Sequence, residues 1–211
     1  MTFLDLPTIT FVLAFGCFAL WLSGFRSRSF YNSLRALHSL ESFEDKCSLL
    51  LRIARQIKKE GPVVATKFEH LTDDPLLKKG LRLLADNLDK TFDFETTLRA
   101  ESYCRIAEVS SAVNYIKFLG ENLPAIGLTG TLIGLVQGSS SISFAILSTL
   151  YGAFLGNIVL MPLFHRYYEK VKYMQLLDDL VISALKKIRD GVHPQLLQEH
   201  LTGYILKNEQ R

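Results

Sequence analysis

The feature that most constrains this chain of 211 residues is an uncharged stretch of 43 residues between Glu121 and His165. One helix needs about 20 apolar residues to cross the hydrocarbon core of a bilayer. The stretch is about twice that length, and the turn-forming sequence QGSSS at 137–141 divides it. We therefore expect two transmembrane helices that are joined by a tight turn.

A second uncharged stretch, residues 6–25, is also about as long as one membrane span. Because Asp5 rather than a basic residue precedes it, we interpret it as a transmembrane helix and not as a cleaved signal peptide. Basic residues flank the three spans on one side only, and residues 137–142 contain none. The positive-inside rule then places the N-terminus outside and residues 26–116 and 166–211 in the cytoplasm.

The other segments have helical patterns. Apolar residues recur at helical spacing in residues 49–57, Asp74 before Pro75 is a helix-start signal, and no glycine or proline interrupts residues 93–119 or 163–190. We predict an all-α integral membrane protein with three transmembrane helices, the last two extended into a cytoplasmic helical domain. The expected order is a first transmembrane helix (1–25), a cytoplasmic helical domain (26–114), a second transmembrane helix (115–137), a short periplasmic turn (138–142), a third transmembrane helix (143–166) and cytoplasmic C-terminal helices (167–211).

Hydroxylated residues occupy positions of the hairpin where a simple anchor carries leucine or isoleucine. Thr131 lies six residues before Gln137, and Thr149 lies six residues after Ser143. At 1.5 Å rise per residue, both hydroxyls are expected roughly 9 Å below the outer end of the hairpin. We predict an ion pathway that contains Thr131, Thr149, Ser148 and Asn157. The structural alternatives are threonines that bond to their own helix and an asparagine that joins two helices.

Glycines recur in the hairpin at the GxxxG spacing that lets helix backbones approach closely in lipid. We expect close packing, within the hairpin and between copies of the chain, at Gly127, Gly130, Gly134, Gly152 and Gly156. Pro124 and Pro162 lie near the cytoplasmic ends of their spans. Each either simply kinks its helix or acts as a hinge for the cytoplasmic part.

Lys78, Lys79 and Arg82 form a cationic face on one predicted helix. Such a face is either solvated or docks electrostatically to another protein. The net charge of +3 gives little support to nucleic-acid binding. His193 and His200 are seven residues apart but lack a third ligand, so we predict no metal site. The glycine-rich GLTGTLIG lacks the Lys-Ser/Thr ending of a phosphate loop, and no enzymatic activity is expected.

Five segments resemble the A subunit of bacterial flagellar stators, in the MotA/TolQ/ExbB family of ion channels, and the resemblance spans nearly the whole chain. The segments are ENLPAIGLTGTLIGLV (121–136), LSTLYGAFLGNIVLMPL (147–163), KKGLRLLADNLD (78–89), GVHPQLLQEHL (191–201) and LDLPTITFVLAFGCFALWLSGF (4–25). The hairpin is most similar to the sodium-driven, PomA-like stators. Residues 4–25 resemble the second of the four stator spans, so the chain is a compact form with three spans.

The resemblance implies a homopentamer in the bacterial inner membrane, around two transmembrane helices of a B subunit. That subunit would supply a membrane-embedded aspartate and a peptidoglycan-binding domain, and Lys78, Lys79 and Arg82 would contact a rotor protein. The hairpin itself has no carboxylate between Glu121 and His165, so a charged ion ligand must come from another chain. No cofactor is expected to stay bound; the ion is cargo.

Three readings of the function remain open at this point. The first is an ion-powered motor subunit, the second a TolQ/ExbB-like energiser of outer-membrane processes, and the third a non-conducting membrane scaffold. For the ion, hydroxyls near one level favour sodium, as does the resemblance of TGTLIGL and STLYGA to sodium-type stators. A proton remains the alternative, because Thr131 and Thr149 also match positions where proton-driven TolQ and ExbB proteins carry threonine.

Overall fold

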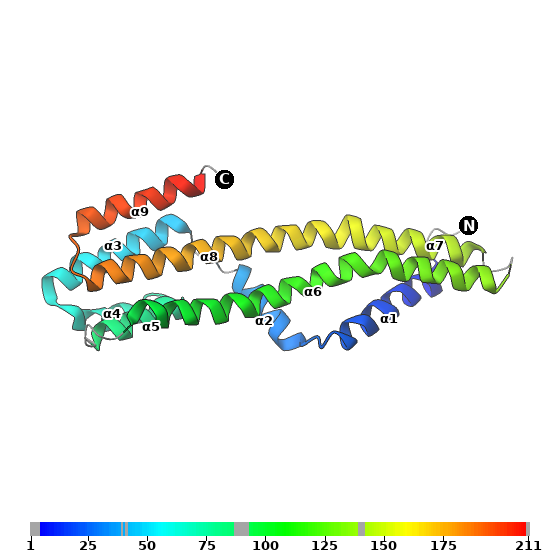
Figure 1. The fold of residues 1–211 in the computed structure, drawn as a ribbon, viewed down its shortest axis with the longest axis horizontal. Coiled ribbons are helices and arrows are strands. Elements are labelled where there is room, and N and C mark those ends of the chain that lie inside the picture. Colours follow the sequence, from blue (N-terminus) through cyan, green and yellow to red (C-terminus); the bar gives the residue numbers. More distant parts are fainter. Residues whose placement is uncertain (1–4, 39, 41, 87–92, 139–141, 210–211) are drawn as a thin grey trace. The chain divides into compact units, whose positions relative to one another are not determined.

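The computed structural model describes residues 5–38, 40, 42–86, 93–138 and 142–209, and all regular structure within these ranges is helical (Figure 1). This confirms the all-α class. The elements are α1 (Leu6–Leu22), α2 (Ser27–His38), α3 (Phe43–Glu60), the 3-10 turn η1 (Pro62–Val64), α4 (Ala65–Glu69), α5 (Pro75–Ala85), α6 (Phe94–Val136), α7 (Ile142–Ala153), the π-helical segment η3 (Phe154–Leu160), α8 (Met161–Arg189) and α9 (Pro194–Glu209).

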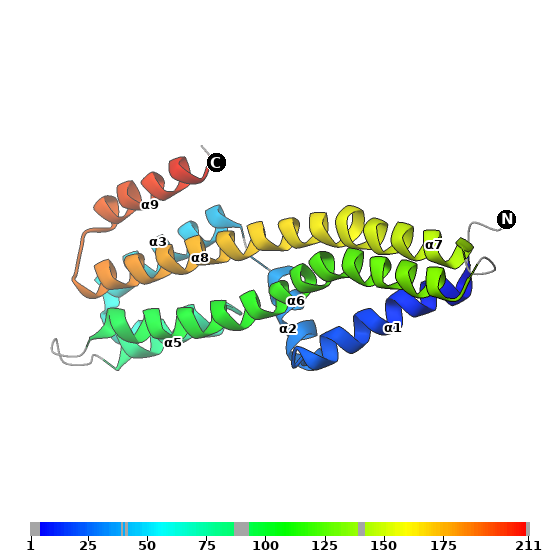
Figure 2. The same ribbon diagram turned by 45° about the vertical axis from the view of Figure 1, so that its right-hand side comes forward.

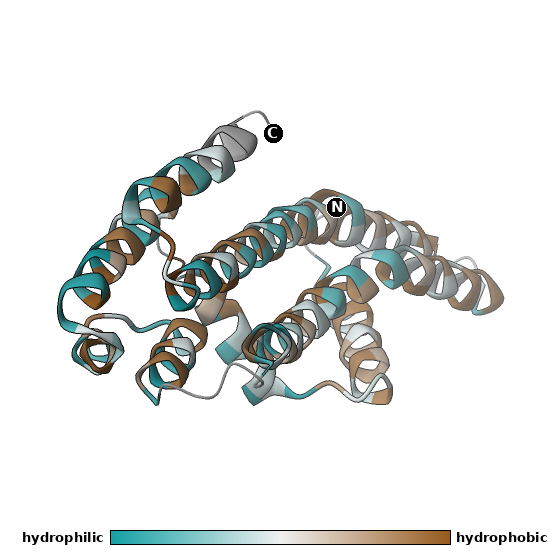
Figure 3. Cartoon of the chain, turned by 60° about the vertical axis from the view of Figure 1, so that its left-hand side comes forward, coloured by the Kyte–Doolittle hydropathy of each residue, from teal (hydrophilic) through white to brown (hydrophobic). Residues whose placement is uncertain are grey.

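Two long helices have the length and composition to cross a membrane: α6, and the continuous helix Ile142–Arg189 that α7, η3 and α8 form together. A third candidate is the pair of α1 and α2, which is bent by 96° at the break between the two helices. Hydropathy colouring shows the apolar character of the hairpin that α7 makes with the end of α6 (Figure 3). The protein is therefore an all-helical chain with two candidate membrane helices, or three if the bent pair counts as one.

The chain divides into two compact units. The first comprises residues 1–38 and 108–171, and the second comprises residues 39–107 and 172–211. In the first unit, α1 packs against α7, which is one arm of the hairpin (Figure 2). The buried face of α1 carries Thr8, Val12 and Gly16. The rings of Phe11 and Phe144 meet edge to face at 5.4 Å, which adds a directional contact between α1 and α7.

The second unit has a hydrophobic core made by α3, α4, α5 and α9 with the adjoining parts of α6 and α8. Among its fully buried side chains are Leu50, Leu76, Leu98, Leu177 and Leu185. α5 approaches α8 so closely that a Cβ at Gly80 would lie 2.3 Å from Leu185 Cδ1. This core positions the N-terminal part of α6 and the C-terminal part of α8 within the unit.

The helix ends agree with local sequence signals. Asp74 accepts a hydrogen bond from the Leu76 N–H at 3.1 Å, as expected for a capping carboxylate before Pro75. Gly61 ends α3 at a φ of 90°, and Gly191 follows α8 at a φ of 74°, where a glycine avoids the strain of the left-handed region. Of the predicted turn at 138–142, residues 139–141 lie outside the described residues, as do residues 87–89 of the KKGLRLLADNLD segment.

The sequence from residue 93 onward forms one long helix without a break, because α6 is a single helix of 43 residues. The expected unbroken rod after the hairpin is also continuous, but it is not α-helical throughout. Its turns widen at η3, where the Met161 N–H donates to the Gly156 carbonyl, five residues earlier. Pro162 follows directly and has no N–H, so the local departure from α-helical bonding has a covalent cause.

Candidate ion-pathway site

Three hydroxyls gather between α6 and α7 in the first unit. The Thr131 and Thr149 hydroxyls are in direct hydrogen-bond contact across the two helices, so they lie at the same level of the helix pair. Thr131 Oγ1 also lies 3.0 Å from the Ala145 carbonyl, and Ser148 Oγ lies 2.9 Å from the same oxygen. The Gly127 carbonyl is within 3.4 Å of all three hydroxyls.

The three hydroxyl-bearing residues differ in how far they are buried. Ser148 is completely buried between the helices, whereas Thr131 and Thr149 are partly exposed at the edge of the helix pair. A hydroxyl has one proton and two lone pairs, so a hydroxyl that donates to a carbonyl still offers oxygen lone pairs to a cation. Of the three, Thr131 and Thr149 are the ones whose oxygens lie nearer to the surface of the hairpin.

The glycines of the hairpin face the other arm of the same hairpin. A Cβ at Gly127 would lie 2.5 Å from the Ser148 carbonyl oxygen, and a Cβ at Gly152 would lie 2.5 Å from the Leu123 carbonyl oxygen. Gly130, Gly134 and Gly156 are comparably close to Ser148, Ala145 and Gly120, respectively. These five glycines therefore pack within one chain. Their spacing is accounted for by the hairpin itself and does not indicate contacts between copies.

Asn157 lies in the π-helical segment η3 and is exposed. Its side chain makes no hydrogen bond to any part of the chain that the structure describes, so it does not join the two arms of the hairpin. Pro124 lies inside α6 near the close contact with Gly156, and Pro162 lies at the start of α8. The sequence reasoning missed η3, although Gly156 and Pro162 together are a signal for weakened α-helical bonding in that turn.

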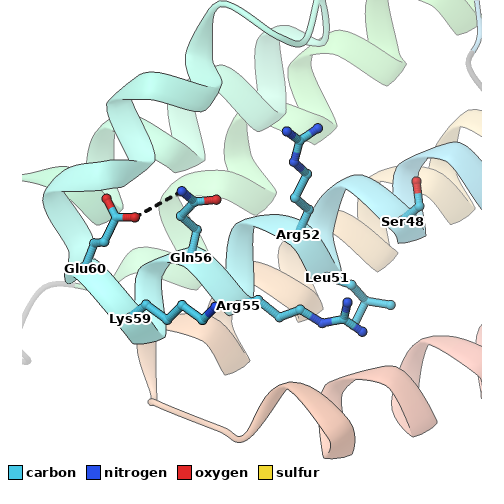
Figure 4. Close-up of a pocket in the computed structure, with 7 residues that line it drawn as sticks. All are labelled: Ser48, Leu51, Arg52, Arg55, Gln56, Lys59 and Glu60. Carbon is cyan, nitrogen blue, oxygen red and sulfur yellow. Dashed lines mark hydrogen bonds between the residues drawn. The ribbon is translucent and has the colours of Figure 1, made fainter.

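The predicted cationic face on α5 is largely neutralised by acidic neighbours. Arg82 pairs with Glu69, Lys79 Nζ lies 2.5 Å from Glu101 Oε2, and Lys78 Nζ lies 3.9 Å from Asp73 Oδ1. The hydrogen bond from Arg82 lowers the pKa of Glu69. By contrast, Arg52 and Arg55 line an open depression on α3 and make no ion pair with the described residues (Figure 4).

A buried charge network in the second unit was not found from the sequence. Arg105 on α6 pairs with Asp178 on α8, and its other terminal nitrogen lies 2.8 Å from Asp74 Oδ1. Lys46 on α3 pairs with Asp74, and Ser102 Oγ donates to Asp178 Oδ2 at 2.7 Å. Two cations and two carboxylates thus balance each other, and Arg105 Nε is buried without a hydrogen-bond partner.

The pKa values of the two carboxyl groups in this network are shifted in opposite directions. Burial raises the pKa of Asp178, and the attraction of Arg105 only partly offsets this effect. Burial also opposes ionisation of Asp74, but Lys46 and then Arg105 together lower the pKa of that group. Asp178 is thus the more easily protonated of the pair.

The two histidines considered for a metal site have other contacts. Ser183 Oγ and His200 Nε2 are 2.9 Å apart, and the Gln195 N–H donates to His193 Nδ1 at 3.4 Å. Burial, followed by the nearby Lys187, lowers the pKa of His200. Within the described residues, no group of three His, Cys, Asp or Glu side chains could hold a metal ion.

Residues 69–179 match the family model described as the MotA/TolQ/ExbB proton channel family, so the chain belongs to that family. It is 27% identical to Motility protein A of Aquifex aeolicus, over 93% of this chain and 84% of that protein. It is 24% identical to Chemotaxis protein PomA of Vibrio alginolyticus, over 96% of this chain and 85% of that protein.

Two solved structures have the same fold. The C. jejuni MotAB structure aligns with a TM-score of 0.83 at 17% identity, and the alignment covers 96% of this chain and 84% of that one. The flagellar MotAB stator complex from Bacillus subtilis aligns with a TM-score of 0.77 at 19% identity, over 99% of this chain and 88% of that one. The three-dimensional similarity therefore extends over nearly the whole chain.

Proposed function

We propose that this chain is the ion-conducting A subunit of a rotary, flagellar-stator-like motor, which couples sodium or proton flow to mechanical force. Family membership, together with relatives named as motility proteins, supports a channel-type membrane protein without enzymatic activity. The observation that carries the proposal is the contact of Thr131 with Thr149, at the edge of an uncharged hairpin. It offers neutral oxygen ligands inside the uncharged hairpin, at positions where a simple anchor carries leucine or isoleucine.

The proposed topology has three transmembrane helices in the bacterial inner membrane, at residues 1–25, 115–137 and 143–166. The N-terminus is outside, and the segments at 26–114 and 167–211 form the cytoplasmic part. Basic residues after the first span and around the hairpin support this orientation.

The proposed assembly is a homopentamer around a dimer of B subunits, each with one transmembrane helix that carries an aspartate. Similarity in fold to two MotAB structures supports a B-type partner. The lack of a carboxylate between Glu121 and His165 gives the partner's aspartate a chemical task, because neutral ligands leave the charge of a buried ion uncompensated. For rotor contact at Lys78, Lys79 and Arg82, an acidic rotor surface would have to compete with the acidic neighbours of these residues.

Thr131→Val tests the pathway, because it removes the hydroxyl and nearly preserves the volume. Thr129→Val is the matched control: Thr129 lies two residues away on the same helix, is exposed, and donates to its own helix at Ala125. Both variants are reconstituted with a cognate B subunit in proteoliposomes, and we expect both to assemble. Only Thr131→Val should lose ion flux, by about tenfold or more, since a hydrogen-bonding contact with a charged group contributes about 1.5–3 kcal/mol. Normal flux in Thr131→Val would refute the pathway.

We propose sodium as the transported ion, with the proton as the alternative. Sodium needs several oxygen ligands at once, and the two partly exposed threonine hydroxyls with the Gly127 carbonyl provide such a group. The test is flux in the absence of a sodium gradient while the proton gradient is kept. Loss of flux is expected; full activity under these conditions would identify a proton-driven machine.

A further inference from the structure

α2 is a short helix in the first unit that follows α1 after a break of four residues. The two helix axes are bent by 96°. If α1 crosses the bilayer along the membrane normal, in the proposed topology, α2 runs nearly parallel to the membrane surface. Trp21, at the end of α1, is 73% exposed, as is typical of aromatic side chains at a membrane–water interface.

The inner face of α2 is held against the rest of the first unit. Ser29 Oγ donates to Glu108 Oε1 on α6 at 2.9 Å, and Leu37 is buried. The Phe30 ring lies 5.3 Å from the Phe25 ring, which in turn meets Tyr115 edge to face. These contacts fix the rotation of α2 about its axis and so determine which residues point away from the protein.

The outer face of α2 carries Arg28, Tyr31, Asn32 and Arg35, which are spaced so that they share one side of a helix. All four are exposed, and Tyr31 is 67% exposed. Neither arginine makes an ion pair with any residue that the structure describes. The guanidinium groups of Arg28 and Arg35 therefore flank the Tyr31 ring without a compensating charge, on a face of α2 that no other described element covers.

We propose that this outer face of α2 binds the headgroups of anionic phospholipids at the cytoplasmic surface of the membrane. Guanidinium groups bind phosphate oxygens in a bidentate manner, and a tyrosine places its ring at the headgroup level with its hydroxyl in water. The cytoplasmic leaflet supplies the complementary negative charge. A protein interface would need an apolar centre, whereas Tyr31 is the one large exposed apolar side chain on α2.

The first experiment compares binding of phosphatidylglycerol with binding of phosphatidylcholine to the full-length protein, by native mass spectrometry after reconstitution with both lipids. The test variant is Arg28→Gln with Arg35→Gln. The matched control is Arg52→Gln with Arg55→Gln, two arginines on α3 that are also exposed and make no ion pair with the described residues. Since each basic residue near the surface contributes about fivefold, we expect the α2 variant to lose about 25-fold of its preference for phosphatidylglycerol. An unchanged preference, or an equal loss in the control, would overturn the inference.

The second experiment locates the outer face relative to the bilayer. Trp21 is the one tryptophan of the chain, so Tyr31→Trp is made in a Trp21→Phe background, and its fluorescence is measured with brominated phosphatidylglycerol or brominated phosphatidylcholine. We expect stronger quenching by the brominated anionic lipid. Absence of quenching by either lipid would mean that a second copy or another protein covers this face, and the proposal would be wrong.

The native Trp21 reports on the proposed topology separately. If brominated lipids quench Trp21 in the unaltered protein but not the indole introduced at position 31, α1 is in the bilayer and only the lipid-binding inference fails. If neither is quenched, the membrane placement of α1 fails, and the inference fails with it.

Discussion

Arg105 gives the sharpest test of how the second unit is held together. Its guanidinium group bridges Asp74 and Asp178, and Asp178 is only 1% exposed. Arg105→Met would leave Asp178 with Ser102 as its remaining polar partner, while Asp74 would keep Lys46. Removing one member of a buried ion pair costs about 3–5 kcal/mol, because the other charge stays buried and uncompensated.

The matched control is Arg99→Met, on the same helix. Arg99 also bridges two carboxylates, Glu95 and Asp179, but its side chain is 56% exposed. Water screens such pairs, so the expected cost is about 0.2–1 kcal/mol for each contact. Chemical denaturation of the full-length protein in detergent, together with hydrogen exchange of the peptides from residues 39–107, measures both variants. Equal costs for the two variants would refute the claim that burial makes the Arg105 network important.

The pH dependence provides an independent test. The pKa of Asp178 is raised in the folded protein, chiefly by burial, so its contribution to stability falls as the pH rises through that pKa. Arg105→Met removes the main attraction that keeps Asp178 ionised and raises this pKa further. The cost of Arg105→Met should therefore shrink as the pH is lowered through this raised pKa, because Asp178 then takes up a proton. Asp74, whose pKa is lowered, stays ionised while Asp178 titrates. A cost that grows on acidification would contradict the assignment.

Two further predictions concern packing and thiol chemistry. Gly127→Ala should loosen the hairpin and lower the melting temperature of the protein in detergent, because the new Cβ would meet the Ser148 carbonyl. The control is Gly203→Ala, where a Cβ meets nothing, and it should be neutral or stabilising by up to about 1 kcal/mol. Equal effects of the two substitutions would contradict the packing. Burial, followed by the charge of Glu44, raises the pKa of Cys47 to about 11. Maleimide at neutral pH should therefore modify the exposed Cys104 well before Cys47. Faster labelling of Cys47 would show that the core opens readily.

Much of the fold could be predicted because it depends on local patterns. The absence of charges between Glu121 and His165 predicts the hairpin, and Asp74 before Pro75 predicts the start of α5. The depth of Thr131 and Thr149 followed from helical rise alone, since both positions are counted from one turn. These features need no knowledge of which distant segments meet.

The features that were missed depend on distant contacts. Lys46, Arg105 and Asp178 lie on three helices and Asp74 is the N-cap of a fourth, and no spacing rule connects them. One local signal did exist. Asp178 falls in the register of Met174, Val181 and Leu185, a stripe that is otherwise apolar and buried, and a charge in such a stripe predicts a buried partner without identifying it.

The three hydroxyls of the hairpin have a limited role in the proposed ion pathway. The hydroxyl protons of Thr131, Thr149 and Ser148 have two backbone carbonyls and each other as acceptors, so the chain satisfies them without an ion. What remains for a cation is a set of neutral lone pairs. Such oxygens can replace part of the hydration shell of sodium, but they cannot neutralise its charge, and none is basic enough to hold a proton. In the proposed pathway, the carboxylate that compensates the charge of either ion has to come from outside residues 122–164, at the level where Thr131 and Thr149 meet.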